Sequence, residues 1–225
     1  KYLRQNGVAV KTCRVTDVLT EGGAVSGVET DCGAYMASSV NVATGGLSYP
    51  GTGSTGDGDA WAKKLGHSVS LLRPSLVELI SDSELCGKCA GLSLKNCGIR
   101  LISDGKTVYE DFGELLFTHR GISGPTVLSA SAHIEPGLPY RMEIDLKPAL
   151  DEGELDRRIT RDFDEEKNRL FRNSLDKLLP SSLRLPVVEL SGTDPEKQVN
   201  SVTREERKQL VYLLKHLPVE GLRLG

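Results

Sequence analysis

The first part of the chain alternates apolar and polar positions before a run of small residues takes over. β-Branched residues alternate loosely over residues 8–18, and two further short runs follow at 25–30 and 35–43. Gly22 and Gly23 mark a turn between the first two runs, because glycine is favoured where a hairpin reverses direction. The pattern predicts a small β-meander that leads into a final buried strand at residues 40–43.

Small and polar residues then replace the strand pattern. Glycine, serine and threonine dominate residues 44–58, and helical character follows from Asp59 to Leu65. Gly66 supplies a stop signal for that helix. We therefore expect a strand, a glycine-rich loop and a helix in that order.

Strand-like runs of apolar residues recur through the middle of the chain. They lie at residues 76–80, 97–102, 107–112, 114–118 and 140–146. Asp104-Gly105 is a hairpin-turn signal between two of them. Several short strands at this spacing are typical of a small barrel or sandwich. One helix interrupts the strands, and we expect it to begin with Pro125 in its first turn and to run towards His133.

The last part of the chain has a helical period. Asp151 with Glu154, and Thr203 with Glu206, have the spacing of a capping box, in which side chains bond to the free backbone amides at a helix start. Apolar residues recur at helical spacing after each box, at Leu155, Ile159 and Phe163 and at Leu210, Leu213, Leu214 and Leu217. Shorter segments between the two helices are separated by Pro180 and Pro186. We expect a small helical subdomain.

Composition and charge narrow the classes of partner. The 225 residues include 28 basic and 31 acidic side chains, which gives a net charge of -3. This charge provides no global positive field to attract nucleic acid, and no run approaches the ~18 apolar residues of a membrane span. We therefore expect a cytoplasmic protein that binds neither nucleic acid nor membrane. The sequence leaves the oligomeric state open.

The five cysteines are spaced irregularly, and an odd count leaves one unpaired in any disulfide framework. We expect free thiols. Cys86 and Cys89 have the spacing of half a zinc site, with Cys97 nearby, but the sequence offers no second matched pair. Cysteines in turns beside Gly87 and Gly91 explain the pattern more simply, so we predict no metal site.

Gly51, Gly53 and Gly56 form the literal pattern G-x-G-x-x-G ahead of a helix. The dinucleotide-binding fingerprint needs its first glycine at the end of a strand, so that the helix N-terminus meets the pyrophosphate. The strand expected here ends near Ala43, well before Gly51. The pattern therefore does not mark a pyrophosphate site.

A longer constellation begins at the end of the same strand. It consists of Ala43, Thr44, Gly45 and Gly46, then Ser48, Tyr49 and Pro50, then residues 52–58. Small residues let a flat or charged ligand lie against backbone amides, and a helix N-terminus favours anions or hydroxyl groups. A flexible glycine loop with Asp57 as an ordinary helix N-cap also explains the composition.

Residues 118–121, Thr-His-Arg-Gly, place an imidazole beside a guanidinium in a loop that ends in glycine. Such a pair could bind a substrate anion or move a proton near neutral pH, although a lone histidine more often has a structural role. His119 and Arg120 are therefore candidate substrate-facing residues. The other histidines, to which the sequence gives no visible partner and we assign no role, are His67, His133 and His216.

Two blocks of this sequence resemble a known protein family. Residues 41–58, Asn-Val-Ala-Thr-Gly-Gly-Leu-Ser-Tyr-Pro-Gly-Thr-Gly-Ser-Thr-Gly-Asp-Gly, resemble the second flavin-contacting region of a family of bacterial FAD-dependent oxidoreductases. That family includes aminoacetone-oxidase-like flavoproteins and proteins linked to bile-acid dehydroxylation. The Ala-Thr-Gly-Gly and Thr-Gly-Asp-Gly elements are also similar to those of fumarate reductase and succinate dehydrogenase flavoproteins. Residues 113–125, Gly-Glu-Leu-Leu-Phe-Thr-His-Arg-Gly-Ile-Ser-Gly-Pro, are similar to a signature in the family's inserted region.

The resemblance implies an α+β fold with a partial Rossmann-type FAD-binding domain (β-meander, strand, helix) followed by an inserted small β-barrel and a helical subdomain. We place these parts at residues 1–69, 70–147 and 148–225. The implied cofactor is FAD. The residues implied to contact it are Ala43, Thr44, Gly45 and Gly46 through their backbone, Asp57 near the cofactor, and Val15, whose main chain would touch the adenine. The inserted domains would cap the flavin, with His119 and Arg120 at the substrate site.

The same resemblance implies that the chain is an internal fragment. The family's N-terminal glycine-rich fingerprint and its C-terminal flavin-covering segment have no counterpart in these residues. We expect the full-length protein to be an FAD-dependent oxidoreductase acting on an unidentified small-molecule substrate, and the fragment alone to be inactive and to lack FAD. Two alternatives stay open: a non-catalytic scaffold whose helices at 151–217 dock on a partner or a second copy, and an RNA-binding barrel, which the acidic, aromatic-poor composition disfavours.

Overall fold

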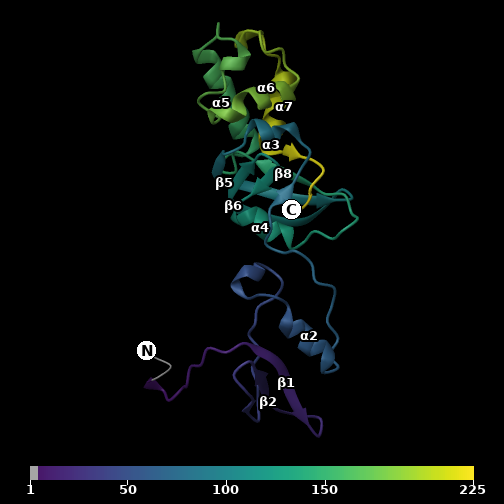
Figure 1. The fold of residues 1–225 in the computed structure, drawn as a ribbon. Helices are drawn as coiled ribbons and strands as arrows, with labels where there is room; N and C mark the ends of the chain where they lie inside the picture. The colour runs from purple at the N-terminus through teal and green to yellow at the C-terminus, as the bar shows by residue number, and fades with distance from the viewer. Residues whose placement is uncertain (1–4) are drawn as a thin grey trace. The chain divides into compact units, whose positions relative to one another are not determined.

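The structure is a computed structural model that describes residues 5–225 and divides the chain into two compact units. The N-terminal unit is Lys1–Leu72 and the C-terminal unit is Arg73–Gly225. Figure 1 colours the N-terminal unit from purple to blue and the C-terminal unit from teal to yellow.

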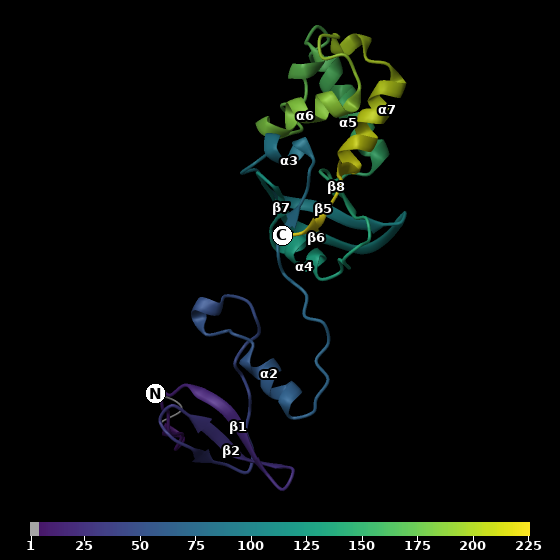
Figure 2. The same cartoon turned by 45° about the vertical axis from the view of Figure 1, so that its right-hand side comes forward.

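The N-terminal unit begins with the β-meander that the sequence predicts. Its three antiparallel strands lie in the order β1-β2-β3, with bounds β1 (Val15–Glu21), β2 (Ala24–Thr30) and β3 (Tyr35–Met36). Gly22 and Gly23 form the turn of the first hairpin. Alternation along β1 turns Val18 inward, where it is 6% exposed. A 3-10 turn, η1 (Pro50–Thr52), and the helix α2 (Asp57–Lys64) follow (Figure 2).

The expectation of a buried strand at residues 40–43 is wrong. These residues have no strand conformation, and the Val42 side chain is 45% exposed. A strand is stable in a sheet only when a neighbour pairs with its backbone N–H and C=O groups. Within the described residues no strand pairs with 40–43, and the meander ends at β3. The loop that leads to α2 therefore begins earlier than the sequence pattern indicates.

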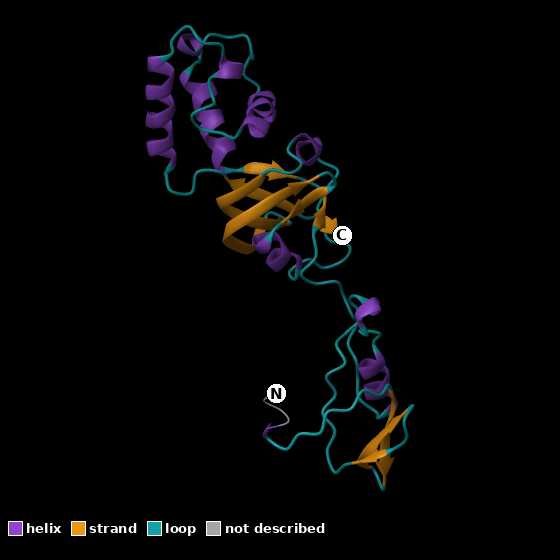
Figure 3. Cartoon of the chain, turned by 60° about the vertical axis from the view of Figure 1, so that its left-hand side comes forward, coloured by secondary structure: helices purple, strands orange, loops and turns teal. Residues whose placement is uncertain are grey.

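A seven-stranded antiparallel sheet forms the framework of the C-terminal unit (Figure 3). The strand order is β10-β4-β7-β6-β5-β8-β9. The strands are β4 (Leu79–Ile80), β5 (Ser93–Ser103), β6 (Lys106–Thr118), β7 (Gly121–Ser123), β8 (Arg141–Asp145), β9 (Leu217–Val219) and β10 (Arg223–Leu224). The long strands β5 and β6 form a hairpin around Asp104-Gly105, as predicted. Because β9 and β10 are edges, the expected small barrel is not closed.

The strands expected separately at residues 107–112 and 114–118 are one strand, β6. Gly113 lies between the two runs and pairs with Cys97 across the ladder. A Cβ atom on Gly113 would lie 3.0 Å from Thr126 Cγ2, so the glycine allows the helix α4 (Pro125–Ser131) to pack closely on β6. As predicted, α4 has Pro125 in its first turn, but it ends before His133.

A helical lobe lies between β8 and β9 in the sequence. It comprises α5 (Glu152–Glu165), η2 (Phe171–Asn173), α6 (Ser181–Ser191), η3 (Val199–Ser201) and α7 (Arg204–Lys215). Both predicted capping boxes are confirmed: Glu154 N donates to Asp151 Oδ1 at 2.7 Å, and Glu206 N donates to Thr203 Oγ1 at 3.2 Å. After α7 the chain returns to the sheet as β9. Within the described residues, none of the helices is long and apolar enough to span a bilayer.

Pro186 does not separate two helical segments as expected, because it lies buried inside α6. A proline at this position removes the backbone N–H that would bond to the Ser182 carbonyl group four residues earlier. The Cys89 thiol lies in that place, and its Sγ donates to the Ser182 oxygen at 3.5 Å. A tertiary contact thus replaces the missing helix hydrogen bond and lets the helix continue.

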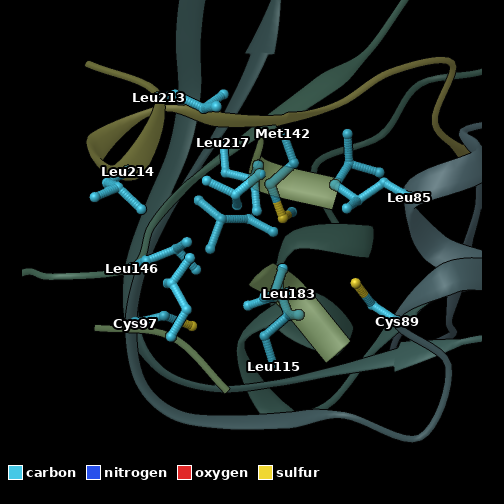
Figure 4. Packing of buried hydrophobic residues seen from close by; sticks show 14 of the residues in the cluster. Leu85, Cys89, Cys97, Leu115, Met142, Leu146, Leu183, Leu213, Leu214 and Leu217 are labelled. Carbon is cyan, nitrogen blue, oxygen red and sulfur yellow. The ribbon is translucent and has the colours of Figure 1, made fainter. Parts of the chain in front are cut away.

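One hydrophobic core joins the sheet to the helices of the C-terminal unit. Figure 4 shows Leu115, Met142 and Leu217 from the sheet in one cluster with Leu183 from α6. Each fully buried aliphatic side chain contributes about 1.5–3 kcal/mol to folding, so this core is the main source of stability in the unit. In the described part of the N-terminal unit, Val18 is the one apolar side chain that is buried.

Candidate functional site

A cleft of about 460 Å³ in the N-terminal unit brings together three of the residues that the sequence assigns to the cofactor. Val15 comes from β1, Thr44 from the loop after the meander, and Asp57 from the start of α2. The other residues that line the cleft are Cys13, Arg14, Gly53, Thr55 and Trp61. The strand, loop and helix of this unit therefore converge on one concave surface.

The other predicted cofactor residues are neighbours in the chain of Thr44, which lines the cleft. Ala43, Gly45 and Gly46 flank Thr44 in the same loop but do not line the cleft wall. A Cβ atom on Gly58 would lie 2.7 Å from Thr44 Oγ1, so only glycine lets the first turn of α2 approach the loop this closely. The glycine-rich composition here is explained by contact between loop and helix as well as by ligand binding.

Asp57 is not the N-cap of α2, which corrects one of the two interpretations drawn from the sequence. Gly56 is the N-cap, and no side chain caps the helix. The first hydrogen bond of α2 runs from Ala60 N to Gly56 O. The backbone N–H groups of residues 57–59 therefore have no partner within the helix and point out of its start. Within the described residues the Asp57 carboxylate has no hydrogen-bond or ion-pair partner. The Asp57 carboxylate and the free N–H groups at the start of α2 are therefore both available to a ligand.

The charges around α2 favour a hydroxyl or amide donor over phosphate. Asp57 and Asp59 lie in its first turn, where carboxylates offset the helix dipole and would repel a phosphate group. At the other end, the Lys64 ammonium group hydrogen-bonds to the Asp17 carboxylate and lowers the Asp17 pKa. This ion pair ties the end of α2 to β1 and helps to hold the cleft walls together.

Sequence reasoning missed several residues of the cleft. Trp61 lies one helical turn after Asp57, a spacing that places both side chains on one helix face and could have identified it. Arg14 directly precedes Val15, but a single arginine before a strand carries no recognisable signal. Thr55 and Gly53 belong to the loop that the sequence analysis had already identified as a candidate ligand-binding segment.

Two thiols and a carboxylate gather next to the cleft. The side-chain ligand atoms of Cys13, Asp31 and Cys32 lie within 4.8 Å of one another. Hydrogen bonds to Cys13 and to the Asp31 carboxylate raise the pKa of the Cys32 thiol to about 12. At neutral pH Cys32 is therefore a thiol, and its Sγ donates to Asp31 Oδ1 at 3.2 Å.

His119 and Arg120 lie together in the turn between β6 and β7, where both are exposed. The turn is held by its backbone: Ser81 N donates to Arg120 O at 2.8 Å, and Arg120 N donates to Thr118 Oγ1 at 3.4 Å. Within the described chain neither side chain has a polar partner, and neither lines the cleft of the N-terminal unit. Both side chains are accessible from solvent.

The three other cysteines pack as apolar side chains. Cys86 lies in α3 (Glu84–Lys88), Cys89 follows that helix and Cys97 lies in β5, and all three are buried in the core. Burial raises the pKa of the Cys86 thiol, and it raises the pKa of both Cys89 and Cys97 to about 11. At neutral pH these groups are thiols, consistent with the donor role of Cys89 towards Ser182.

His216 has partners that the sequence does not reveal. It faces Glu143, a carboxylate on β8 that is 7% exposed, and its Nδ1 lies 3.1 Å from Glu143 Oε2. Arg100 Nη2 donates to the same oxygen at 2.8 Å, and Arg141 Nη2 lies 3.0 Å from Oε1. Arg100, Glu143 and His216 border a separate cleft of about 600 Å³ in the C-terminal unit. The Arg100 and Arg141 guanidinium groups thus compensate the charge of the buried carboxylate.

Comparison with known proteins identifies relatives of most of the chain. The family described as "HI0933-like protein barrel and H2TH domain" matches residues 73–222. Ribosomal RNA dihydrouridine synthase of Haemophilus influenzae is 32% identical over 184 residues, which cover 81% of this chain and 43% of that protein. The Escherichia coli protein of the same name is 30% identical over 173 residues, covering 77% and 41%.

A third relative has a different name. The 3-dehydro-bile acid delta(4,6)-reductase of Clostridium scindens is 27% identical over 168 residues, which cover 73% of this chain and 41% of that protein. The chain thus spans about two fifths of the length of the curated relatives it matches. The matched region coincides with the sheet and helical lobe of the C-terminal unit, and the chain therefore belongs to the HI0933-like protein family, which is related to FAD-dependent oxidoreductases.

Proposed function

We propose that the full-length protein is an FAD-dependent oxidoreductase that reduces a carbon–carbon double bond conjugated to a carbonyl group in a small molecule. The observation that carries the proposal is the common chemistry in the relatives' names. Dihydrouridine is uridine with its ring C=C bond reduced, and a delta(4,6)-reductase of a 3-dehydro bile acid removes unsaturation near a ketone. The two names describe one reaction type on different substrates.

The cleft of the N-terminal unit fits part of a dinucleotide. Asp57 offers a carboxylate without a partner among the described residues, which would accept a hydrogen bond from an FAD hydroxyl group. The loop from Ala43 to Gly46 presents backbone without bulky side chains. The Val15 main chain would border the adenine. Reduced FAD would supply the hydride for the reaction. The pyrophosphate would need other residues, because Asp57 and Asp59 repel phosphate at the start of α2.

His119 and Arg120 would face the substrate. Reduction of a conjugated C=C bond adds a hydride at one carbon and a proton at its neighbour, while negative charge develops on the carbonyl oxygen. A guanidinium group such as that of Arg120 stabilises this charge, and an imidazole nitrogen of His119 can deliver the proton near neutral pH. Both side chains are exposed and have no competing partner in the described chain.

The five free thiols support a reducing cytoplasm as the compartment.

A test of the cofactor assignment uses two matched substitutions in the full-length protein. Asp57→Asn removes the carboxylate that lines the cleft, whereas Asp59→Asn makes the same change of charge in the same helical turn outside the cleft wall. We expect Asp57→Asn to weaken FAD binding by about ten- to 150-fold, the effect of losing one charge-assisted hydrogen bond. Asp59→Asn should change it little. Equal FAD dissociation constants in the two variants would remove Asp57 from the site.

A uridine base in RNA is the second candidate substrate, favoured by the name shared by two relatives. The net charge of -3 and the 5% aromatic content favour the small molecule instead. The enzyme can be reduced without oxygen and mixed with 2-cyclohexenone, a 4-en-3-one steroid or a uridine-containing oligonucleotide, while flavin absorbance is followed. Reoxidation by either enone supports the small-molecule proposal, and reoxidation by the oligonucleotide alone contradicts it. Reoxidation by none of them contradicts the proposed reaction type.

A further inference from the structure

A second cavity in the C-terminal unit has the features of a ligand site and is separate from the cleft around Asp57. Its volume is about 680 Å³, within the range of ~300–1,000 Å³ typical of small-molecule sites. Phe112 on β6 and the loop after β8, with Leu146, Pro148 and Leu150, supply an apolar wall. Leu178 adds to this wall from the helical lobe. Phe112 is 59% exposed, so a ligand in this cavity would cover apolar surface that now faces solvent.

One cation in this cavity has no acidic partner. Within the described residues the Lys147 ammonium group makes no hydrogen bond or ion pair. Both backbone groups of Lys147 are hydrogen-bonded. Lys147 N donates to Asp145 Oδ1 at 2.8 Å, and Lys147 O accepts from Lys215 Nζ at 3.1 Å. Burial, followed by the nearby Arg158 charge, lowers the Lys147 pKa. The fold therefore fixes the loop in place and holds an uncompensated amine at the cavity wall.

The other cations of the cavity are already neutralised. Arg158 Nε donates to both carboxylate oxygens of Asp162, at 3.0 and 2.9 Å. Lys177 Nζ donates to Glu165 Oε2 at 2.9 Å. The cavity thus carries one unpaired positive charge next to an apolar wall, and the carboxylates around it would repel a ligand with two negative charges.

We propose that this cavity binds an amphipathic monocarboxylate, with the carboxylate group on Lys147 and the apolar body against Phe112 and the loop of Leu146, Pro148 and Leu150. A single carboxylate matches the single uncompensated charge, and the apolar wall matches a hydrocarbon chain or ring system. An ion pair at a half-buried amine gains from reduced solvent screening, and covering Phe112 removes apolar surface from water. The site does not depend on FAD or on the proposed reaction.

The test uses the 225-residue chain with decanoate as the probe and decanol as its neutral counterpart, both below their critical micelle concentrations, in titration calorimetry. Lys147→Met keeps an unbranched apolar side chain of similar length and removes the charge. Lys106→Met, at the exposed start of β6 next to the hairpin turn, is the matched control. Since the Lys147 ammonium group has no described partner, Lys147→Met should not lower the melting temperature.

We expect decanoate to bind one saturable site, and Lys147→Met to weaken that binding about tenfold or more while leaving decanol binding unchanged. Lys106→Met should alter neither ligand. Phe112→Ala should weaken both ligands, because it removes part of the apolar wall without changing the charge. The proposal is overturned if decanoate shows no saturable binding, if Lys147→Met and Lys106→Met have equal effects on decanoate, or if Phe112→Ala leaves both affinities unchanged.

Discussion

The two units of the chain differ in where their apolar side chains lie. In the C-terminal unit one continuous cluster runs from Leu79 to Leu222 and joins the sheet to the helices. In the N-terminal unit Val18 is the one buried apolar side chain that the structure describes, while Val42, Leu47 and Leu71 are exposed. The unit with the stronger core carries the family match, and the unit with the weaker core carries all six candidate cofactor residues.

The two units therefore differ in what holds them in shape. A large core fixes backbone geometry without help, so the C-terminal unit can serve as a framework. A unit with one buried apolar side chain gains little from the hydrophobic effect, and its order depends on other contacts. Under the proposed function, binding of the cofactor would supply such contacts in the N-terminal unit.

The largest expected effect comes from matched truncations in the two units. Leu115→Ala removes a fully buried side chain from β6 and should lower the free energy of unfolding by about 2–5 kcal/mol. Leu71→Ala removes a side chain that is 79% exposed and should change it by less than about 0.5 kcal/mol. Urea unfolding of the 225-residue chain measures both. Similar losses in the two variants would contradict the difference in apolar burial between the two units.

A second prediction concerns the contact that allows Pro186 inside α6. Cys89→Ala removes the thiol donor and leaves the Ser182 carbonyl group unpaired, which should cost about 1–3 kcal/mol. In a Pro186→Ala background the new backbone N–H can bond to Ser182 O, so the same Cys89 substitution should cost about 1 kcal/mol less. A double-mutant cycle by chemical denaturation gives this coupling. Zero coupling would mean that the thiol does not replace the helix hydrogen bond.

The smallest expected effect on stability concerns the N-terminal ends of two helices, α7 in the C-terminal unit and α2 in the N-terminal unit. Thr203→Ala removes a side-chain cap from α7 and should cost about 1 kcal/mol. Asp57→Ala removes no cap, because Gly56 is the N-cap of α2, and should cost only about 0.3 kcal/mol through the helix dipole. Thermal melting in low salt can resolve the two. A loss of 1 kcal/mol or more for Asp57→Ala would assign this residue a capping role after all.

Features set by neighbours in the sequence could be predicted, and features set by distant contacts could not. The capping boxes at Asp151 and Thr203 and the hairpin turn at Asp104-Gly105 depend on a few adjacent residues, and the structure contains all three. Whether residues 40–43 form a strand depends on a pairing partner, which local pattern does not reveal.

The same distinction applies to the candidate site. Val15, Thr44 and Asp57 lie far apart in sequence, and their convergence on one cleft was expected from the family resemblance rather than from periodicity. Trp61 could have been found from its helical spacing to Asp57. The partners of His216, Glu143 and Arg100, lie in strands distant from it in sequence, so no sequence pattern identifies them.

Hydrogen exchange measured by mass spectrometry on the full-length protein, with and without FAD, tests the central claim most directly. We predict that FAD slows amide exchange in residues 13–61, which contain the cleft around Asp57, and leaves exchange in β5 and β6 nearly unchanged because their core is already stable. If FAD protects β5 and β6 instead, or leaves residues 13–61 unaffected, then the N-terminal unit does not hold the cofactor.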